Sequence, residues 1–300
     1  MSRLDVLMPH FRDPEGLALS LASVAGQSWT GDIRIIIVDD GSPGADFRAV
    51  EALAAAQELP VVLERNTVNR GRPYTRNRLL DAIDSPYVAW LDAGDVWYPA
   101  KIEKQFEQFS RLRLAGEDIT RYWITCHYDW QWTGRKPRLI HQDTGERQVR
   151  ELMLGRKLRA YLWTLLGTAE SFRAAGRFDE RLPRLQDLDY FLRFVLGGGT
   201  LTVPEKTRAL CLYHKSDLGR NAREIRRCNR LIRDKYNPHL RIYGPAFLRT
   251  IRYNADMLAA RFAGNNGERL KQLYYMGSAV ADHPKRAVGA MRHHLLRAGK

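Results

Sequence analysis

Two groups of aspartates, each directly after a run of apolar residues, are the side chains best suited to chemistry in this 300-residue chain. Asp39 and Asp40 form the first group, and Asp92 and Asp95 the second. Such apolar runs predict buried strands of a parallel sheet, whose carboxyl ends are where open α/β folds bind ligands. Carboxylates there can accept hydrogen bonds from a base and ribose, or hold a divalent cation against phosphates. The two groups together predict a site for a nucleotide diphosphate.

The alternative for either group is a local role, in which the acids cap helices or begin turns. The sequence Asp-Gly-Ser-Pro at 40–43 fits a turn of this kind. Two groups about fifty residues apart in one alternating pattern favour a shared ligand site over two separate turns.

The elements expected to position these acids alternate along the first hundred or so residues. Strands are predicted at 4–8, 33–38, 61–64 and 87–91, and helices at 15–26, 47–57, 72–83 and 99–114. This alternation implies βαβ crossovers and a mainly parallel sheet. The fold class is therefore predicted to be α/β, with a Rossmann-like mixed, mainly parallel sheet flanked by helices.

The second half of the chain is predicted to extend that sheet and then to become helical. We expect strands that turn back across the sheet at 122–132, a loop-rich stretch at 133–148, a helix at 190–196, strands near 200–203 and 209–213, and an almost wholly helical region at 220–300. The predicted division is 1–218 for the ligand-binding domain and 219–300 for a basic C-terminal helical extension.

The chain carries a formal charge of +14, from 48 basic against 34 acidic side chains. Such an excess attracts polyanions, so nucleic acid, anionic lipid and acidic glycans are all candidate partners. A predicted helix at 222–236 aligns Ile225, Cys228, Leu231 and Ile232 along one stripe with arginines around it. This amphipathic basic helix could cover a helical subdomain with a solvated face, dock on a membrane surface, or bind nucleic acid.

Composition excludes several classes of protein. A hydrophobic content of 44% argues against disorder. The three cysteines are widely spaced, which argues against a disulfide scaffold or zinc ribbon and favours a reducing cytoplasm. Asp5 and Pro9 interrupt the apolar start, so a signal peptide is not expected. No segment approaches the roughly 20 apolar residues that span a bilayer.

Seven short motifs, taken in order and spacing, resemble the family-2 glycosyltransferases with the GT-A fold over about residues 3–215. They are Pro9-His10-Phe11, the Ser-Val-Ala-Gly-Gln-Ser at 23–28, the Ile-Val-Asp-Asp-Gly-Ser at 37–42, Asn69-Arg70-Gly71, Thr75-Arg76-Asn77, the Trp-Leu-Asp-Ala-Gly-Asp at 90–95, and Asp187-Leu188-Asp189. The resemblance implies a GT-A domain that transfers a sugar with inversion from a nucleotide-diphosphate donor, usually with Mn²⁺ or Mg²⁺, to a hydroxyl of a glycan.

The resemblance also implies a role for particular residues. The implied nucleotide-binding set is Pro9, Phe11, Asp39, Asp40, Asn69, Arg72, Arg76, Asn77 and Asp92. The implied metal set is Asp92, Asp95 and His214, and the implied catalytic base is Asp187.

The chemistry of the reaction accounts for these residue types independently of the family. Arginines such as Arg72 or Arg76, or a divalent ion, can neutralise the charge of the diphosphate leaving group. A carboxylate on the opposite face can take the proton of the attacking hydroxyl, and inversion follows if no covalent intermediate forms. Asp187 opens a predicted helix, whose N-terminus favours an ionised acid, although it could simply cap that helix. Asp189 would orient neighbours or face solvent.

Two positions depart from the family pattern. Gly94 stands where the family's metal motif has an acid, so the cation could be held by Asp95, by His214, or be replaced by arginines. Gln186 stands where the family has a glutamate before the base.

We therefore predict an inverting glycosyltransferase that uses a nucleotide-diphosphate sugar as donor, and we favour a UDP-sugar. The acceptor would be a glycan or glycolipid of capsule, lipopolysaccharide or exopolysaccharide synthesis, on which Trp130, Trp132 and Trp163 could stack if they are not core residues. The expected location is the cytoplasm or the inner face of the membrane. The alternatives are an inactive nucleotide-sugar-binding protein and a basic nucleic-acid-binding protein; the second lacks a helix-turn-helix or zinc signature, and we expect no nucleic-acid partner.

Overall fold

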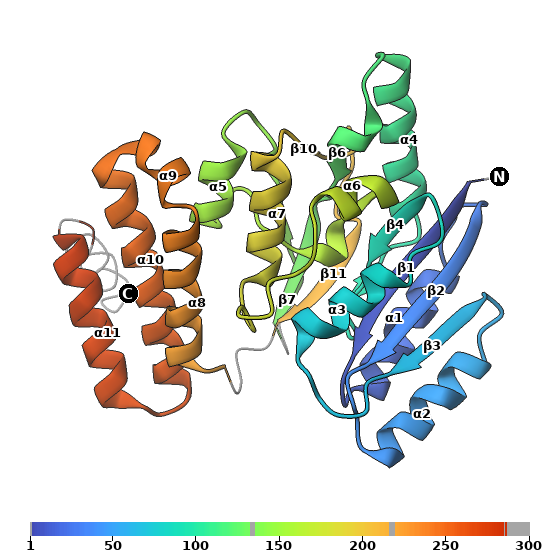
Figure 1. Cartoon of the computed structure of the whole chain (residues 1–300), viewed down its shortest axis with the longest axis horizontal. Helices are drawn as coiled ribbons and strands as arrows, with labels where there is room; N and C mark the ends of the chain where they lie inside the picture. The colour runs from blue at the N-terminus through green and yellow to red at the C-terminus, as the bar shows by residue number, and fades with distance from the viewer. Residues whose placement is uncertain (1, 133–135, 216–219, 285, 287–300) are drawn as a thin grey trace. The chain divides into compact units, whose positions relative to one another are not determined.

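A computed structural model of the chain describes residues 2–132, 136–215, 220–284 and 286, and its helices and strands are shown in Figure 1. The chain divides into two compact units. The N-terminal unit comprises Met1–Arg181 and Gln186–Ser216, and the C-terminal unit comprises Leu182–Leu185 and Asp217–Lys300.

The N-terminal unit contains a seven-stranded sheet with the order β10-β6-β9-β4-β1-β2-β3. Its strands are β1 (Arg3–His10), β2 (Asp32–Asp39), β3 (Val61–Arg65), β4 (Tyr87–Trp90), β6 (Tyr122–Ile124), β9 (Leu166–Thr168) and β10 (Thr200–Thr202). The pairs β1–β2, β2–β3, β1–β4 and β6–β10 are parallel, and β9 runs antiparallel to both of its neighbours. The predicted mixed, mainly parallel sheet is confirmed.

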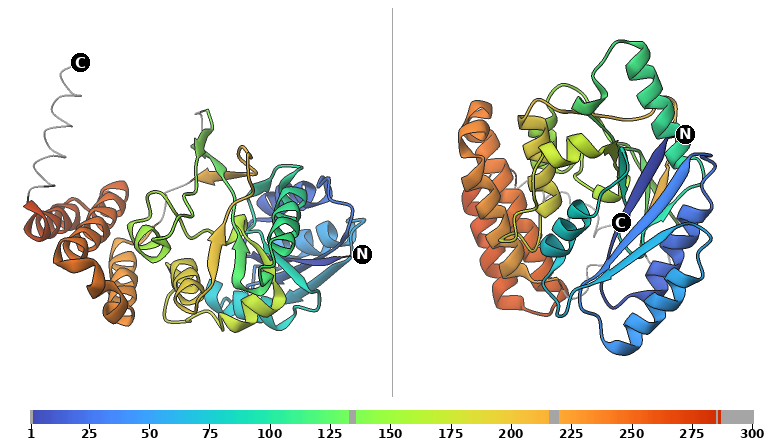
Figure 2. Two further views of the ribbon diagram at one scale, coloured as in Figure 1. Left: turned by 90° about the horizontal axis from the view of Figure 1, so that it is seen from above. Right: turned by 45° about the vertical axis from the view of Figure 1, so that its right-hand side comes forward.

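Helices cover both faces of this sheet, because the central strands are apolar on both sides. The helices of the unit are α1 (Pro14–Ala25), α2 (Gly44–Ala55), α3 (Arg72–Asp81), α4 (Lys101–Leu114), α5 (Gln148–Leu154), α6 (Ala169–Ala174) and α7 (Gln186–Leu196), with short 3₁₀ turns at Ile119–Arg121 and Leu162–Thr164. Leu17 of α1, Val50 of α2 and Phe109 of α4 share one core cluster with alternate residues of β1 and β2. The turned view shows the central strands between helices (Figure 2).

A second sheet of four strands, in the order β5-β11-β7-β8, begins directly after the second group of aspartates. Its strands are β5 (Val96–Trp97), β7 (Tyr128–Trp132), β8 (Arg138–Ile140) and β11 (Cys211–Lys215). The predicted loop at 133–148 is therefore wrong in part, since it contains β8 and the first residue of α5; residues 133–135 lie outside the described residues. Trp163 is 2% exposed and belongs to the core, whereas Trp132 is 39% exposed.

All three cysteines are buried free thiols. Cys126 and Cys211 nevertheless lie with their Sγ atoms 3.4 Å apart in the core of the N-terminal unit. Because these two cysteines are 85 positions apart in the chain, their contact could not be predicted from the sequence.

The described residues of the C-terminal unit beyond 220 are mainly helical, as predicted for 220–300. It contains α8 (Ala222–Lys235), α9 (Asn237–Leu240), a 3₁₀ turn at Arg241–Tyr243, α10 (Gly244–Asn265) and α11 (Arg269–Asp282). On α8, Ile225, Cys228 and Ile232 are buried, which confirms the predicted apolar stripe, while Leu231 is partly exposed. Residues 287–300 lie outside the described residues. No helix among the residues described is both long and apolar enough to cross a membrane.

Candidate active site

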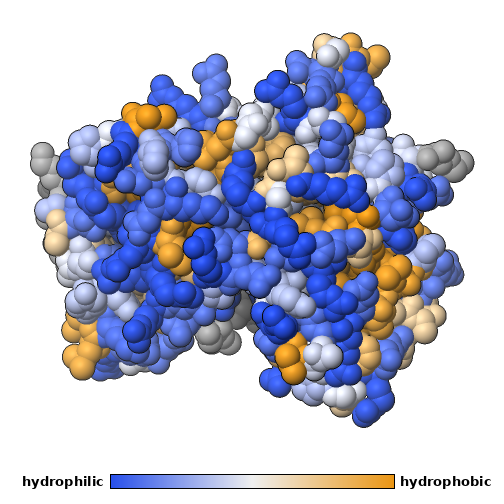
Figure 3. All heavy atoms as spheres, viewed as in Figure 1, coloured by the Kyte–Doolittle hydropathy of each residue, from blue (hydrophilic) through white to orange (hydrophobic). Residues whose placement is uncertain are grey.

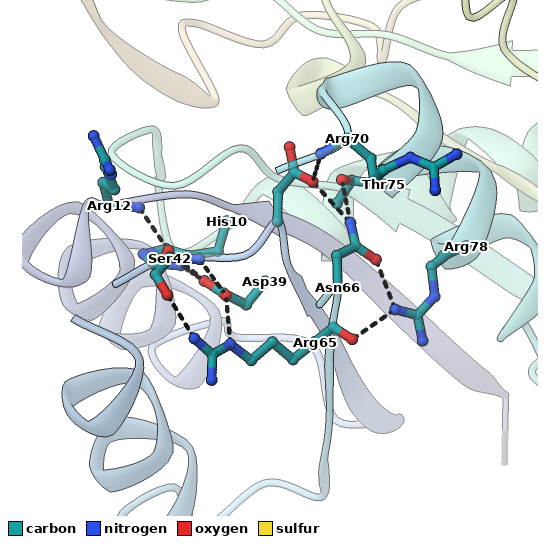
Figure 4. A network of polar contacts seen from close by, with 10 residues as sticks. His10, Arg12, Asp39, Ser42, Arg65, Asn66, Arg70, Thr75 and Arg78 are labelled. Carbon is teal, nitrogen blue, oxygen red and sulfur yellow. Dashed lines mark hydrogen bonds and ion pairs between the residues drawn. The ribbon is translucent and has the colours of Figure 1, made fainter. Parts of the chain in front are cut away.

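Asp39, at the carboxyl end of β2, is completely buried, and both of its carboxylate oxygens accept hydrogen bonds from the protein (Figure 4). Its Oδ2 accepts from His10 Nδ1 at 2.8 Å and from Ser42 Oγ at 2.6 Å, and its Oδ1 accepts from the Ser42 amide at 2.9 Å. The Arg65 guanidinium lies 3.6 Å from Oδ1. Burial alone would raise the pKa of Asp39, but the hydrogen bonds from His10 and Ser42 outweigh it and hold that pKa below its ordinary value.

Asp40 organises the segment that leads into α3. Its Oδ1 accepts from Asn66 Nδ2 and from the Arg70 amide, each at 2.8 Å, and its Oδ2 accepts from the Gly71 amide at 2.8 Å. Asn66 also binds Thr75 Oγ1 at 3.1 Å, so the network continues into α3 (Figure 4). Gly71 has φ of 87°, a left-handed conformation that favours glycine, at the point where its amide turns toward the carboxylate. Asp40, which the sequence predicts as a ligand contact, therefore also holds the loop before α3 in shape.

The other predicted nucleotide contacts fall into two groups. Phe11 is 39% exposed beside this network, and Asn69 and Arg72 are also exposed, so these three side chains are accessible to a ligand. Asn77 is only 2% exposed: its Oδ1 accepts from the Phe178 amide at 2.7 Å and its Nδ2 donates to the Phe178 carbonyl at 3.1 Å. The Asn77 amide therefore fixes the segment ahead of α7. Pro9, on β1, is partly buried.

Arg76 of α3 joins the second group of aspartates to the predicted base. Its guanidinium is 1% exposed. Nη2 donates to both carboxylate oxygens of Asp92, at 2.8 and 2.9 Å, and Nη1 donates to Oδ1 of Asp187 at the start of α7. One buried arginine thus brings together the carboxyl end of β4 and the N-terminus of α7, which are far apart in the sequence.

The two carboxylates on Arg76 differ in their electrostatics. Burial tends to raise the pKa of Asp92, but the charges of Arg76 and Arg72 more than offset this and lower it. For Asp187 burial is again the largest influence, and together with the nearby negative charge of Asp92 it leaves the pKa raised despite Arg76. A raised pKa makes Asp187 a stronger proton acceptor than an ordinary carboxylate. Its side chain is 22% exposed, so an acceptor can reach it.

Asp95 lies in the same region but has no comparable support. It is 6% exposed, and among the described residues no hydrogen-bond or ion-pair partner contacts its carboxylate. Burial, followed by the negative charge of Asp92, raises its pKa well above the ordinary value, and the charges of Arg72 and Arg76 offset this only in part. This is a buried carboxylate whose ionised form has too little counter-charge.

The described residues do not gather a complete metal site. No three His, Cys, Asp or Glu side chains within them lie close enough to hold an ion together. His214 is exposed on β11, where it is paired in register with Gln131, and Asp92 is occupied by Arg76. Gly94 has φ of 91°, a backbone conformation that an aspartate rarely adopts. The carboxylate of Asp95 suits a hard cation, which needs few protein ligands when phosphate oxygens complete its shell.

Asp189 is buried and forms a salt bridge with Arg193 at 3.1 Å. The expectation that Asp189 could face solvent is wrong, and its role within α7 is structural. The predicted helix also begins earlier than 190, at Gln186, which places Asp187 in its first turn.

Two residues that contact Asp39 or Asp40 and their neighbours were not predicted from the sequence as site residues. Asn66 binds Asp40 and Thr75, and Arg65 donates to the Ser42 carbonyl at 2.6 Å. Arg65 ends β3 and Asn66 follows it, and the carboxyl end of β3 adjoins that of β2, so sheet topology was the only signal that could have identified them.

A model of the family described as "Glycosyl transferase family 2" matches residues 5–179. The succinoglycan biosynthesis protein ExoW of Rhizobium meliloti is 31% identical over 128 residues, which are 42% of this chain and 38% of that protein. An uncharacterized glycosyltransferase of Escherichia coli, YibD, is 31% identical over 129 residues, 43% of this chain and 35% of that protein. The UDP-Glc:alpha-D-GlcNAc-diphosphoundecaprenol beta-1,3-glucosyltransferase WfgD of Escherichia coli is 24% identical over 112 residues, 37% and 43% of the two chains. The match therefore spans less than half of each of these relatives.

Solved structures show the same fold over nearly the whole chain. TarS 1–349 from S. aureus, in complex with UDP-GlcNAc, superposes with a TM-score of 0.62 at 13% identity and covers 98% of this chain and 92% of that one. The mannosyltransferase PcManGT from Pyrobaculum calidifontis, in complex with GDP-Man and Mn²⁺, gives a TM-score of 0.58 at 17% identity, covering 97% and 79%. The fold is that of the GT-A glycosyltransferases.

Proposed function

Because this chain belongs to glycosyltransferase family 2, we propose that it transfers a sugar from a nucleotide-diphosphate donor to a hydroxyl of a glycan, with inversion at the sugar carbon. The observation that carries this proposal is the buried Asp92–Arg76–Asp187 bridge. It links an acid at a ligand-binding sheet edge to a second acid that is partly accessible and has a raised pKa.

In the proposed reaction Asp187 is the general base. The acceptor oxygen bonds to the sugar carbon while the bond from that carbon to the diphosphate oxygen breaks. The hydroxyl proton passes to the Asp187 carboxylate, and the nucleoside diphosphate leaves with the bond's electron pair. Attack from the face opposite the leaving group inverts the configuration. Arg76 keeps Asp187 oriented before the acceptor arrives, and Arg72 is an exposed arginine that can bind the diphosphate.

The nucleotide would bind at the edge formed by Phe11, Asp40 and Asn69. Asp40 retains one acceptor position on Oδ2 beyond its bond from Gly71, which suits a donor group of a base or ribose. Asp39 accepts the same number of hydrogen bonds, but it is completely buried and the Arg65 guanidinium lies 3.6 Å from the oxygen with the remaining position, so we assign it the task of holding the loop in place.

A divalent cation is the cofactor we propose, with Asp95 as its principal protein ligand. Asp92 would have to leave Arg76 to join it, and Asp92, Asp95 and His214 do not gather into a three-residue site among the described residues. When bound, Mn²⁺ or Mg²⁺ would supply positive charge to the diphosphate leaving group. The buried carboxylate of Asp95 supports this assignment, because a cation would relieve the unfavourable charge that raises its pKa.

We propose a UDP-sugar as donor and a glycan or glycolipid of polysaccharide synthesis as acceptor. Support comes from relatives with related tasks in their names: succinoglycan biosynthesis for ExoW, and a lipid-linked diphosphate sugar for WfgD. The proposed location is the cytoplasm at the inner face of the membrane, where such lipid-linked acceptors would be reached. The Trp132 side chain, exposed on β7, is the aromatic residue we propose for contact with acceptor sugar.

A panel of nucleotide sugars, scored for nucleotide release with and without Mn²⁺, tests this function. We expect release with one donor class, above the rate of the Asp187→Asn variant. Intact UDP binding with no release under any donor and cation would favour the inactive binding protein instead. A protein that binds no nucleotide but binds DNA or RNA with sequence preference would contradict the proposal altogether.

A further inference from the structure

The positive charge of the chain lies almost entirely in its C-terminal part. Residues 219–300 contain 18 lysines and arginines against 5 aspartates and glutamates, whereas residues 1–218 contain 30 against 29. A domain that performs sugar transfer has no need of this asymmetry. It indicates that the C-terminal unit meets an anionic partner of its own.

The last described helix, α11, also has an apolar face whose side chains are largely exposed, although the Arg226 guanidinium lies 5.5 Å from the centroid of the Tyr274 ring. Leu270 is 85% exposed, Leu273 64%, Tyr274 63% and Val280 36%. These positions follow the spacing of one helix face. Gly277 lies between them, and a side chain placed there would meet no atom within 4 Å, so the space beside this face is open. We call the four exposed residues the α11 stripe.

The opposite side of α11 accounts for the packing of the helix. Tyr275 is 6% exposed and Ala279 fully buried, and both belong to core clusters with residues of α10. The α11 stripe is therefore not needed for the fold of the unit. Arg269 and Lys271, both exposed, flank the stripe, and the hydrophobic patch at the lower left edge of Figure 3 overlies the start of this helix within a mostly hydrophilic surface.

We propose that the C-terminal unit docks on an anionic lipid surface, with the α11 stripe inserted among the headgroups and the surrounding arginines and lysines paired with lipid phosphates. An apolar helix face bordered by basic side chains is the combination that interfacial helices use, and each part strengthens binding to anionic bilayers. The proposal deepens the location given above and rests on it, but its test needs no catalytic activity, so the two proposals can fail separately.

Two other partners for the α11 stripe, a second copy of the chain and nucleic acid, fit its charge and apolar residues less well. A second copy of the chain would bring two strongly basic units together, which costs electrostatic free energy. Nucleic acid would satisfy the arginines, but its binding has no use for exposed leucines. An anionic membrane satisfies both the charge and the apolar stripe.

Co-sedimentation of the full chain with vesicles tests the proposal. We expect binding to phosphatidylcholine vesicles that contain about 30% phosphatidylglycerol to be at least about tenfold tighter than to phosphatidylcholine alone, and to weaken in about 0.5 M NaCl. The double variant Leu270→Gln, Leu273→Gln should lose about tenfold in affinity for the anionic vesicles. The matched control is Leu114→Gln on α4, a leucine 89% exposed in the N-terminal unit, which should bind like the parent.

Three outcomes would overturn the proposal. One is equal affinity for neutral and anionic vesicles. Another is a double variant that binds the anionic vesicles as tightly as the parent, together with a parent that binds duplex DNA or RNA more tightly than it binds the vesicles. This result would assign the positive charge to nucleic-acid binding. The third is a parent that sediments as a dimer in the ultracentrifuge and a double variant that sediments as a monomer, which would assign the stripe to a second copy.

Discussion

The two groups of aspartates lie at the carboxyl ends of strands in the same sheet, yet they differ in how many protein groups donate hydrogen bonds to their carboxylates. Asp39 and Asp40 receive hydrogen bonds from His10, Ser42, Asn66 and two backbone amides. On the other side, one arginine serves both Asp92 and Asp187, and Asp95 has no such partner among the described residues.

The difference separates the acids that build the site from those available for chemistry. A carboxylate that accepts several hydrogen bonds from protein donors is fixed and ionised, as the lowered pKa of Asp39 indicates. A buried carboxylate without enough counter-charge can improve its free energy by binding a cation or a proton, as the raised pKa values of Asp95 and Asp187 indicate.

The largest effect is expected at Asp187. Asp187→Asn keeps the size and a hydrogen-bond acceptor for Arg76 but cannot take the acceptor proton. Turnover should fall by about two to four orders of magnitude, while UDP affinity and thermal stability change little. Steady-state kinetics and calorimetry measure both, and retention of more than about a tenth of the parent turnover would remove Asp187 from the role of base.

Asp189, two residues further along α7, offers the matched control. It is an aspartate of the same helix, but it is buried against Arg193. Asp189→Asn should lower the unfolding midpoint because it removes the buried negative charge paired with Arg193, whereas Arg76 keeps Asp92 as an ion-pair partner in Asp187→Asn. A large loss of turnover in this variant at unchanged stability would show that the two acids cannot be separated as proposed.

The second effect is expected at Asp40. Asp40→Ala leaves three donors, Asn66 Nδ2 and two backbone amides, without their acceptor in a buried position. The free energy of unfolding should fall by about 2–4 kcal/mol, and UDP affinity should fall with it. Denaturant unfolding and UDP calorimetry measure the two quantities. Unchanged UDP affinity in a folded variant would move the nucleotide elsewhere.

The third effect concerns the cation. If Asp95 holds it, EDTA should reduce transfer by at least about tenfold and Mn²⁺ should restore it. Asp95→Ala should reproduce the effect of EDTA. Transfer that survives EDTA and falls instead in Arg72→Ala would show that arginines alone neutralise the diphosphate.

The smallest expected effect is a change in the unfolding midpoint when an aspartate is replaced by asparagine. Its sign should differ between the two groups of aspartates. The folded-state pKa of Asp95 lies above the unfolded value, so its ionised form lowers stability at neutral pH, and this loss disappears as the pH falls through the folded pKa. Asp95→Asn should therefore raise the unfolding midpoint at neutral pH by about 2–4 °C, the shift that about 1 kcal/mol produces in a domain of this size.

Asp39 should behave in the opposite way. Its folded-state pKa is lowered, so its contribution is present above the unfolded pKa and is lost as the pH falls through the folded one. Thermal scans across pH of Asp95→Asn and Asp39→Asn against the parent measure both. A lower midpoint for Asp95→Asn at neutral pH would mean that this carboxylate is satisfied in the fold.

The sequence predicted the sheet and the positions of the acids because both depend on local patterns. The apolar runs before Asp39 and Asp92 are continuous, as expected for strands buried on both faces. The short strand β8 was not predicted, since its three residues form a strand only by pairing with β7.

The partners of the acids could not be predicted from the sequence. Nothing local in Arg76 indicates that it contacts Asp187, which is 111 positions away. Asn77 matches a family motif for ligand contact, and only the structure reveals that its amide is used by Phe178. The number of protein hydrogen bonds that each carboxylate accepts separates the two groups of aspartates, and it depends on distances that only the folded chain defines.

The stereochemistry of the transferred sugar tests the central claim most directly. NMR can follow the parent protein with its preferred nucleotide sugar and report the anomer of the first product, with a glycan acceptor or with water in its place. Inverting transfer with Asp187 as base predicts a first product whose anomeric configuration is opposite to that of the donor, with one nucleoside diphosphate released per sugar. A product that keeps the donor's configuration would contradict it, because retention requires a covalent or front-face route that a single base on the opposite face does not provide.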